Sequence, residues 1–170
     1  MRVIGIDPGL ATTGYGVVER RGPKLVGVAM GVIRTPSGAA QAERLVMLAS
    51  ALRRLIAEAR PEAAAVERLF FNSNVRTAMA VGQASGVVML ALAEAGLEVT
   101  DYTPLEVKQS VVGVGNATKH QVQSMVAALL ELPSLPKPAD AADACALAIC
   151  HTNRSGLARA LATAQRDSAR

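Results

Sequence analysis

The chain has 170 residues, 51% of them hydrophobic, and a net charge of +4 from 18 basic and 14 acidic residues. This length favours one domain with a full hydrophobic core, and no apolar run is long enough to predict a transmembrane helix. The N-terminus lacks the layout of a signal peptide. Cys145 and Cys150 are poorly spaced for a disulfide within one predicted helix and indicate buried thiols. We therefore expect a cytoplasmic protein without membrane association.

Short apolar runs separated by turn signals predict the strands. The first run, which ends at the turn-forming pair Pro8-Gly9, is typical of a strand buried on both faces. A second turn at Arg21-Gly22-Pro23 separates two further runs, so the first three strands form a meander. The predicted strands are residues 2–7, 14–20, 24–35, 63–69 and 98–102.

Helical periodicity predicts the remaining elements. Leu45, Leu48 and Leu52 lie on one apolar stripe. Gly96 is a suitable stop for a second helix, and Thr118 is a suitable N-cap for a later one. The predicted helices are residues 45–56, 75–95, 104–111, 119–130 and 139–153.

This order of elements predicts an α/β fold with a mixed five-stranded sheet. A three-strand antiparallel meander precedes two strands that are reached through helices, which favours parallel pairing beyond the meander and helices on both faces. The sequence contains no internal repeat and no low-complexity linker. We therefore expect one domain over residues 1–153 and a basic, partly disordered tail over residues 154–170.

Four carboxylates stand where solvated surface acids are not expected. Asp7 and Glu67 end apolar strands, and Asp140 and Asp143 open the apolar stretch of the last helix. Acids in such positions are costly to desolvate unless a cation compensates their charge. Hard divalent cations prefer carboxylate oxygens, so the four residues together predict a metal-dependent hydrolase. The pair on the helix is weak support by itself, because acids are common in a first helical turn without any function.

The basic residues are distributed unevenly. No acid occurs between Arg68 and Ala93, within residues 107–130, or within residues 144–166, and these segments contain Arg76, Lys108 and Lys119. An acidic site among basic segments suits a polyanionic substrate, whose flanking phosphates need cations. An ordinary basic cytoplasmic protein would show the same net charge, so charge alone leaves both interpretations open.

Several motifs in collinear order resemble the RuvC family of bacterial Holliday-junction resolvases, which have the ribonuclease H-like fold. The resemblance covers residues 1–153. The motifs that carry it are Gly5-Ile6-Asp7-Pro8-Gly9, Thr13-Gly14-Tyr15-Gly16, Glu67 with Phe70, Val107-Lys108-Gln109, Lys119 with Gln121-Val122, and Asp140-Ala141-Ala142-Asp143.

The resemblance implies an endonuclease that nicks two opposed strands of a four-way DNA junction in recombination and repair. It implies that Asp7, Glu67, Asp140 and Asp143 are catalytic and bind two magnesium ions, for which manganese can substitute. It further implies a two-fold homodimer formed through the long helix at residues 75–95, and partnership with the RuvA–RuvB branch-migration complex. Small residues along that helix are consistent with close approach of another helix, although a packed core would explain them equally well.

Aromatic and basic residues near these acids are candidates for DNA contacts. The chain has two phenylalanines, Phe70 and Phe71, which follow Glu67 directly and could stack on bases or fill the core. By resemblance, Phe70 contacts a base and Lys108 and Lys119 contact phosphates. Arg76, just beyond the same loop, is a further candidate for DNA binding.

Two alternatives belong to other functional classes. Asp7-Pro8-Gly9 with Thr12-Thr13-Gly14 also resembles the first phosphate loop of actin-like ATP-binding domains. That interpretation leaves Glu67 and the acidic pair of the last helix unexplained, and such proteins bind ATP between two domains. A non-catalytic junction-binding module is the other alternative, against which the intact set of acids argues.

Overall fold

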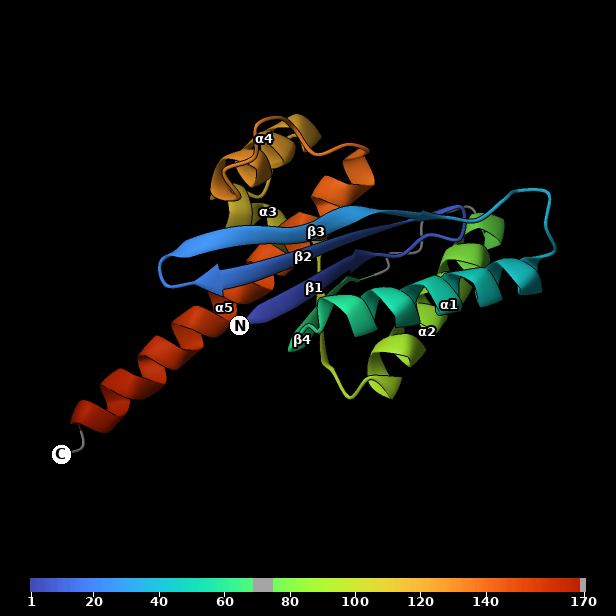
Figure 1. Ribbon diagram of the computed structural model, residues 1–170. Coiled ribbons are helices and arrows are strands. Elements are labelled where there is room, and N and C mark those ends of the chain that lie inside the picture. Colours follow the sequence, from blue (N-terminus) through green and yellow to red (C-terminus); the bar gives the residue numbers. More distant parts are fainter. Residues whose placement is uncertain (69–74, 169–170) are drawn as a thin grey trace.

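The computed structural model describes residues 1–68 and 75–168. The elements in chain order are β1 (Arg2–Asp7), β2 (Thr12–Arg21), β3 (Lys24–Arg34), α1 (Gln41–Ala59), β4 (Ala63–Glu67), α2 (Val75–Glu94), β5 (Glu98–Tyr102), α3 (Pro104–Val112), α4 (Lys119–Leu129) and α5 (Ala139–Ser168). Figure 1 shows their arrangement. Each predicted strand and helix is present, and most boundaries lie within two residues of the predicted ones.

The strands form one mixed sheet in the order β3-β2-β1-β4-β5. β2 pairs antiparallel with both β1 and β3, whereas β4 pairs parallel with both β1 and β5. This topology confirms the predicted three-strand meander with two parallel strands beside it. It places β1 at the centre of the sheet, with its carboxyl end next to that of β4.

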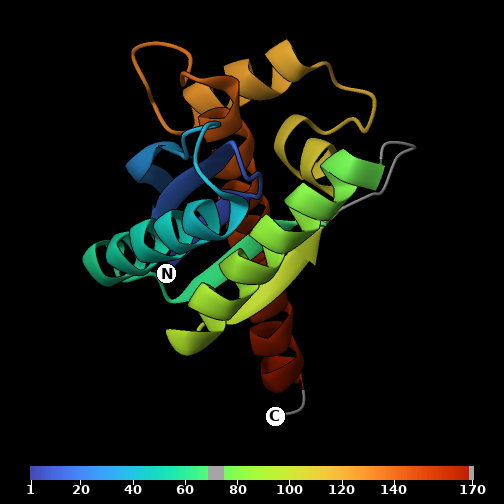
Figure 2. The same cartoon turned by 90° about the vertical axis from the view of Figure 1, so that its right-hand side faces the viewer.

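Helices cover both faces of the sheet and enclose two hydrophobic clusters. On one face, α1 and α2 pack on Ile4 and Ile6 of β1 through residues such as Leu48 and Leu92 (Figure 2). On the other face, α3, α4 and α5 pack against Val3 and its neighbours. Among the described residues, no helix is long and apolar enough to span a membrane.

Helix α5 lies directly on β1 and β2 because glycines face it. A Cβ atom at Gly5 would overlap the carbonyl oxygen of Ala144, and one at Gly16 would lie 2.6 Å from the backbone nitrogen of Cys145. Contacts this short are not tolerated between a side chain and a helix backbone. The glycines therefore set the depth at which α5, and with it the acidic pair at its start, approaches the sheet.

The end of α5 differs from the prediction. The helix continues to Ser168 rather than ending near Asn153, and Figure 1 shows it extending beyond the sheet. Residues 157–164 are rich in alanine and leucine, both strong helix formers, and contain no proline. This local propensity outweighs the helix-weakening effect of Gly156. The division of the chain into a domain and a tail at residue 153 stays a prediction.

Candidate active site

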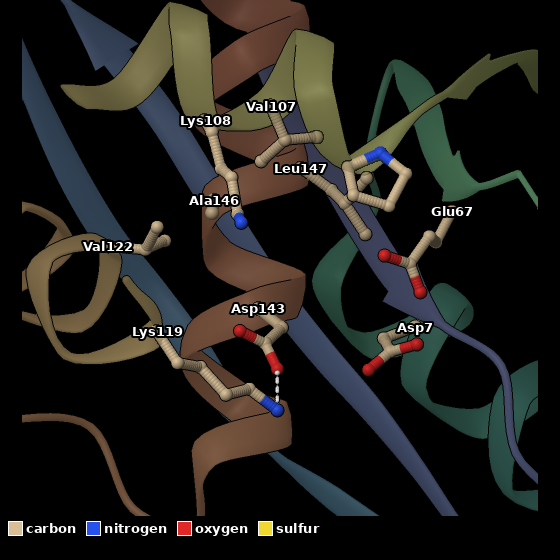
Figure 3. A pocket seen from close by; sticks show the side chains of 10 residues that line it. Asp7, Glu67, Val107, Lys108, Lys119, Val122, Asp143, Ala146 and Leu147 are labelled. Carbon is tan, nitrogen blue, oxygen red and sulfur yellow. Dashed lines mark ion pairs between the residues drawn. The ribbon is translucent and has the colours of Figure 1, made fainter. Parts of the chain in front are cut away.

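Three of the four predicted acids line one pocket of about 320 Å³ on the α5 side of the sheet (Figure 3). Asp7 enters it from β1, Glu67 from β4 and Asp143 from α5. Lys108 of α3 and Lys119 of α4 line the same pocket. The structure therefore brings together, from five elements, residues that span more than 130 positions of the sequence.

Strand register explains why Asp7 and Glu67 are neighbours. In the parallel ladder Ile6 pairs with Val66, so the two acids are the next pair along, at the carboxyl ends of both strands. Because side chains alternate along a strand, Asp7 shares a face with Gly5, which lies against α5. The loop after Asp7 is held by the hydroxyl of Thr13, which donates a hydrogen bond of 2.6 Å to the carbonyl oxygen of Gly9.

Asp140 lies beside this pocket rather than in its lining. Its backbone packs so closely on β2 that a Cβ atom at Gly14 would overlap the Asp140 carbonyl oxygen. The charge of Asp140 nevertheless raises the pKa of both Asp7 and Lys119. Of the two acids in the first turns of α5, Asp143 faces the pocket and Asp140 lies beside it.

Burial and the charges of neighbouring acids raise the pKa values of Asp7 and Glu67. Burial, followed by the charge of Glu67 and a hydrogen bond with it, raises the pKa of Asp7 to about 8, and Asp143 and Asp140 add to the effect. Burial also raises the pKa of Glu67, although its hydrogen bond with Asp7 and the charge of Lys119 oppose that rise. The pocket thus holds more negative charge than its own cations compensate.

One pocket lysine is paired with an acid. Nζ of Lys119 lies 2.9 Å from Oδ2 of Asp143, and Figure 3 marks this ion pair. The pair is the first cause of a raised Lys119 pKa. Lys108 comes from α3, whose start is held by a capping box in which Thr103 and Glu106 exchange hydrogen bonds. Both lysines predicted to contact DNA therefore lie on helices with well-capped starts.

The side chains do not converge on a single point in this arrangement. Within residues 1–68 and 75–168, no group of three or more histidine, cysteine, aspartate or glutamate side chains lies close enough together to hold a metal ion jointly. The physical reason is visible in the contacts. Asp143 is turned toward Lys119, whose Nζ lies 2.9 Å from its Oδ2, rather than toward Asp7 and Glu67.

One group of pocket residues was missed by the sequence-based expectations, and another group is not tested by the structure. The apolar wall of the pocket was not predicted, because apolar helix positions give the same sequence signal whether they line a pocket or fill a core. That wall consists of Pro104, Val107, Val122, Ala146 and Leu147. Phe70 and Phe71 lie outside the described residues, and Arg76 lies in the first turn of α2, so their DNA contacts stay predictions.

Comparison with known proteins identifies the family. A family model described as "Crossover junction endodeoxyribonuclease RuvC" matches residues 3–151. The crossover junction endodeoxyribonuclease RuvC of Chloroflexus aggregans is 55% identical over 151 residues, which cover 89% of this chain and 92% of that protein.

Solved structures agree with the sequence match. The RuvC structure of Thermus thermophilus superposes with a TM-score of 0.85 at 37% identity, covering 93% of this chain and 97% of that one. The T. thermophilus RuvC in complex with a Holliday junction substrate also superposes with a TM-score of 0.85, at 35% identity over 92% of this chain and 96% of that one. The match of the family model over most of the chain, together with these identities, shows that the chain belongs to the RuvC family of crossover junction endodeoxyribonucleases.

Proposed function

We propose that this protein resolves four-way DNA junctions by metal-dependent hydrolysis of phosphodiester bonds. The observation that carries the proposal is that Asp7, Glu67 and Asp143 line one pocket together with Lys108 and Lys119. Hydrolysis by activated water needs no protein nucleophile, which suits a pocket built from acids and lysines. The relative from T. thermophilus binds a Holliday junction substrate, and a four-way junction is the substrate we propose here.

The donor chemistry of the pocket fits a divalent metal ion. Asp7 and Glu67 are partly buried acids whose pKa values are raised, first by desolvation and then by neighbouring acids. Carboxylate oxygens are the preferred ligands of magnesium. We propose that Asp7, Glu67 and Asp143 hold magnesium, or manganese in its place, and that Asp140 contributes a ligand or its field. When bound, two metal ions activate the attacking water and stabilise the leaving 3′ oxygen.

The remaining pocket residues would bind and orient the substrate. Lys108 and Lys119 stand on helices at one side of the acids and can contact the phosphates that flank the scissile bond. The apolar wall formed by residues such as Val107 and Leu147 excludes water from that side, which strengthens the electrostatic contacts inside. Phe70, Phe71 and Arg76 would extend the DNA surface beyond the pocket.

Neutralising a pocket lysine should weaken junction binding in a salt-dependent way. The plot of log K against log salt has a negative slope. We expect Lys108→Met and Lys119→Met each to make this slope shallower by about 0.9, because binding releases one counterion fewer when one phosphate contact is lost. Fluorescence anisotropy with a labelled junction measures this slope. Lys24→Met is the matched control, since Lys24 pairs with Glu131 at the surface and does not line the pocket. An unchanged slope in both pocket variants would remove the lysines from the DNA surface.

We propose that two copies associate through α2, since paired incisions require two active sites. Met79 and Leu90 are 62% and 54% exposed on this helix, and the space around Gly82 and Gly86 is open. These four residues lie at spacings of three or four along one side of the helix, where a second helix can approach closely. The exposed apolar side chains would be buried in such a dimer.

Leu90→Glu should convert the dimer to a monomer and abolish paired incision. A charge placed in a helix interface is left desolvated and unpaired, which strongly disfavours association. Sedimentation equilibrium measures the change in mass. Leu105→Glu provides the control, because Leu105 is 59% exposed on α3 and lies outside the proposed interface. A Leu90→Glu variant that remained dimeric would place the interface elsewhere.

The resemblance also suggests a cellular setting for this activity. Cys145 and Cys150 are buried free thiols, consistent with the reducing cytoplasm that we propose as the location. Branch migration by a RuvA–RuvB complex would supply the junction in a position suitable for cutting.

The proposed substrate selectivity is tested by comparing two DNA molecules. In the presence of magnesium, the protein should nick a synthetic four-way junction and leave a linear duplex of the same sequence intact. Equal nicking of both molecules would indicate a non-selective nuclease, and binding without nicking would indicate a junction-binding module.

A further inference from the structure

The ion pair between Lys119 and Asp143 joins two residues that the proposed function assigns to different partners. Nζ of Lys119 lies 2.9 Å from Oδ2 of Asp143, although the proposed function assigns the carboxylate to a metal ion and the ammonium group to DNA. The side chain of Asp143 is 23% exposed and that of Lys119 is 65% exposed. The carboxylate of the pair is therefore largely shielded from solvent, whereas the lysine side chain is exposed.

Local helix energetics do not explain the position of this ammonium group. Lys119 is the first residue of α4, where the positive end of the helix dipole disfavours a cation. The backbone there is held by a capping box in which Thr118 and Gln121 exchange hydrogen bonds. The long side chain nevertheless reaches across to α5, so the attraction comes from the acids rather than from its own helix.

The contact is specific to one of the two pocket lysines. Among the residues that the structure describes, Lys119 makes an ion pair within 4.0 Å of a carboxylate in the pocket, and Lys108 does not. The charges of Asp140 and Asp7 also raise the pKa of Lys119, and the charge of Lys119 lowers the pKa of Glu67. Lys119 therefore pairs directly with Asp143, and its charge reaches the other acids of the pocket only from a greater distance.

We infer that Lys119 is a built-in counterion for the acidic cluster, which a divalent metal ion must displace from Asp143 when it binds. The inference rests on the proposed function, which makes Asp143 a metal ligand. An ammonium group and a metal ion that approach the same carboxylate repel each other strongly at contact distance. The displaced side chain is then available for a phosphate of the DNA, so metal binding and DNA contact are coupled through Lys119.

The exposure of Lys119 makes this exchange easy. Partly exposed ion pairs contribute little free energy, because solvent screens them and the lysine side chain loses conformational freedom when it is held. Its removal from Asp143 requires only rotation of a side chain, while the capped start of α4 stays in place. Lys119 therefore compensates the acids when no metal is bound and lowers metal affinity only modestly.

The inference is tested by measuring manganese binding to the protein alone. Electron paramagnetic resonance of free Mn²⁺ gives the dissociation constant without DNA and without turnover. We expect Lys119→Met to bind Mn²⁺ about fivefold more tightly than the parent protein, because the competing ion pair is absent. Lys108→Met removes the same charge from the same pocket but breaks no ion pair, and should change the constant less than twofold.

A double variant separates the ion pair from a general charge effect. In an Asp143→Asn background, Lys119→Met should raise Mn²⁺ affinity clearly less than it does in the parent protein, since the pair is already absent and only the longer-range charge effect on Asp7 and Glu67 remains. Unchanged or weaker binding by Lys119→Met alone would overturn the inference, as would an equal gain from Lys108→Met. A parent protein that binds Mn²⁺ but does not cut junctions would contradict the proposed function without affecting this comparison.

Discussion

Replacing Asp7 with asparagine should lower junction cleavage by roughly 10³-fold or more while leaving junction affinity largely intact. The side chain keeps its shape but loses the charge that would hold the metal, whereas affinity comes mainly from cations that meet phosphates. Single-turnover cleavage and anisotropy, measured on the same junction, give the two quantities. Asp101→Asn is the matched control, because Asp101 is an exposed acid on β5, and its loss should change neither quantity.

A stability measurement shows whether Asp7→Asn loses activity through misfolding. In the metal-free protein the pKa of Asp7 rises from 3.8 to about 8, so the folded state holds a proton that the unfolded state releases. The free energy of unfolding should therefore fall as pH rises from about 4 to about 8. Asp7→Asn should show a weaker fall and should be at least as stable as the parent at pH 8. A variant that is inactive and less stable at pH 8 would contradict this account of the pocket.

Replacing Gly5 with alanine should destabilise the fold strongly. The added methyl group would overlap the carbonyl oxygen of Ala144, and both the strand and the helix are fixed parts of the core. Such overpacking should cost about 3 kcal/mol in the free energy of unfolding, because neither backbone can move aside cheaply. It should also reduce cleavage, since α5 carries Asp143 and would have to move away from β1. Urea denaturation followed by circular dichroism measures the loss.

Gly156→Ala provides the matched control for that experiment. Gly156 also lies in α5, but among the described residues an added Cβ atom there would have no neighbour within 4 Å. Alanine should stabilise this helix by up to about 1 kcal/mol, because glycine is the weaker helix former. A Gly5→Ala protein as stable as the parent would show that α5 does not lie directly on the sheet.

The sheet and the acids were largely predictable because local signals and tertiary packing agree there. The apolar run ending at Asp7 and the turns after it predict a buried strand and a meander, and the structure has both. Parallel pairing of β1 with β4 then places Glu67 beside Asp7. Membership of the RuvC family favours the nuclease prediction over the actin-like alternative.

Features that depend on three-dimensional contacts could not be predicted. Asp143 lines the pocket and Asp140 lies beside it. This difference depends on the rotation of α5 against the glycines of β2. The ion pair of Asp143 with Lys119 joins two helices whose relative position has no local signal. The continuation of α5 to Ser168 had a local signal, the alanine-rich composition, which the polar residues of that segment obscured.

The most direct test of the central claim is a map of cleavage sites on a four-way junction with and without divalent metal. The account predicts paired nicks at symmetric positions on two opposed strands in magnesium, and none when a chelator removes the metal while the junction stays bound. Calcium should support binding with little cleavage, because it prefers longer and looser coordination than magnesium. Undiminished nicking in excess chelator, or no nicking in magnesium by the folded dimer, would contradict the account.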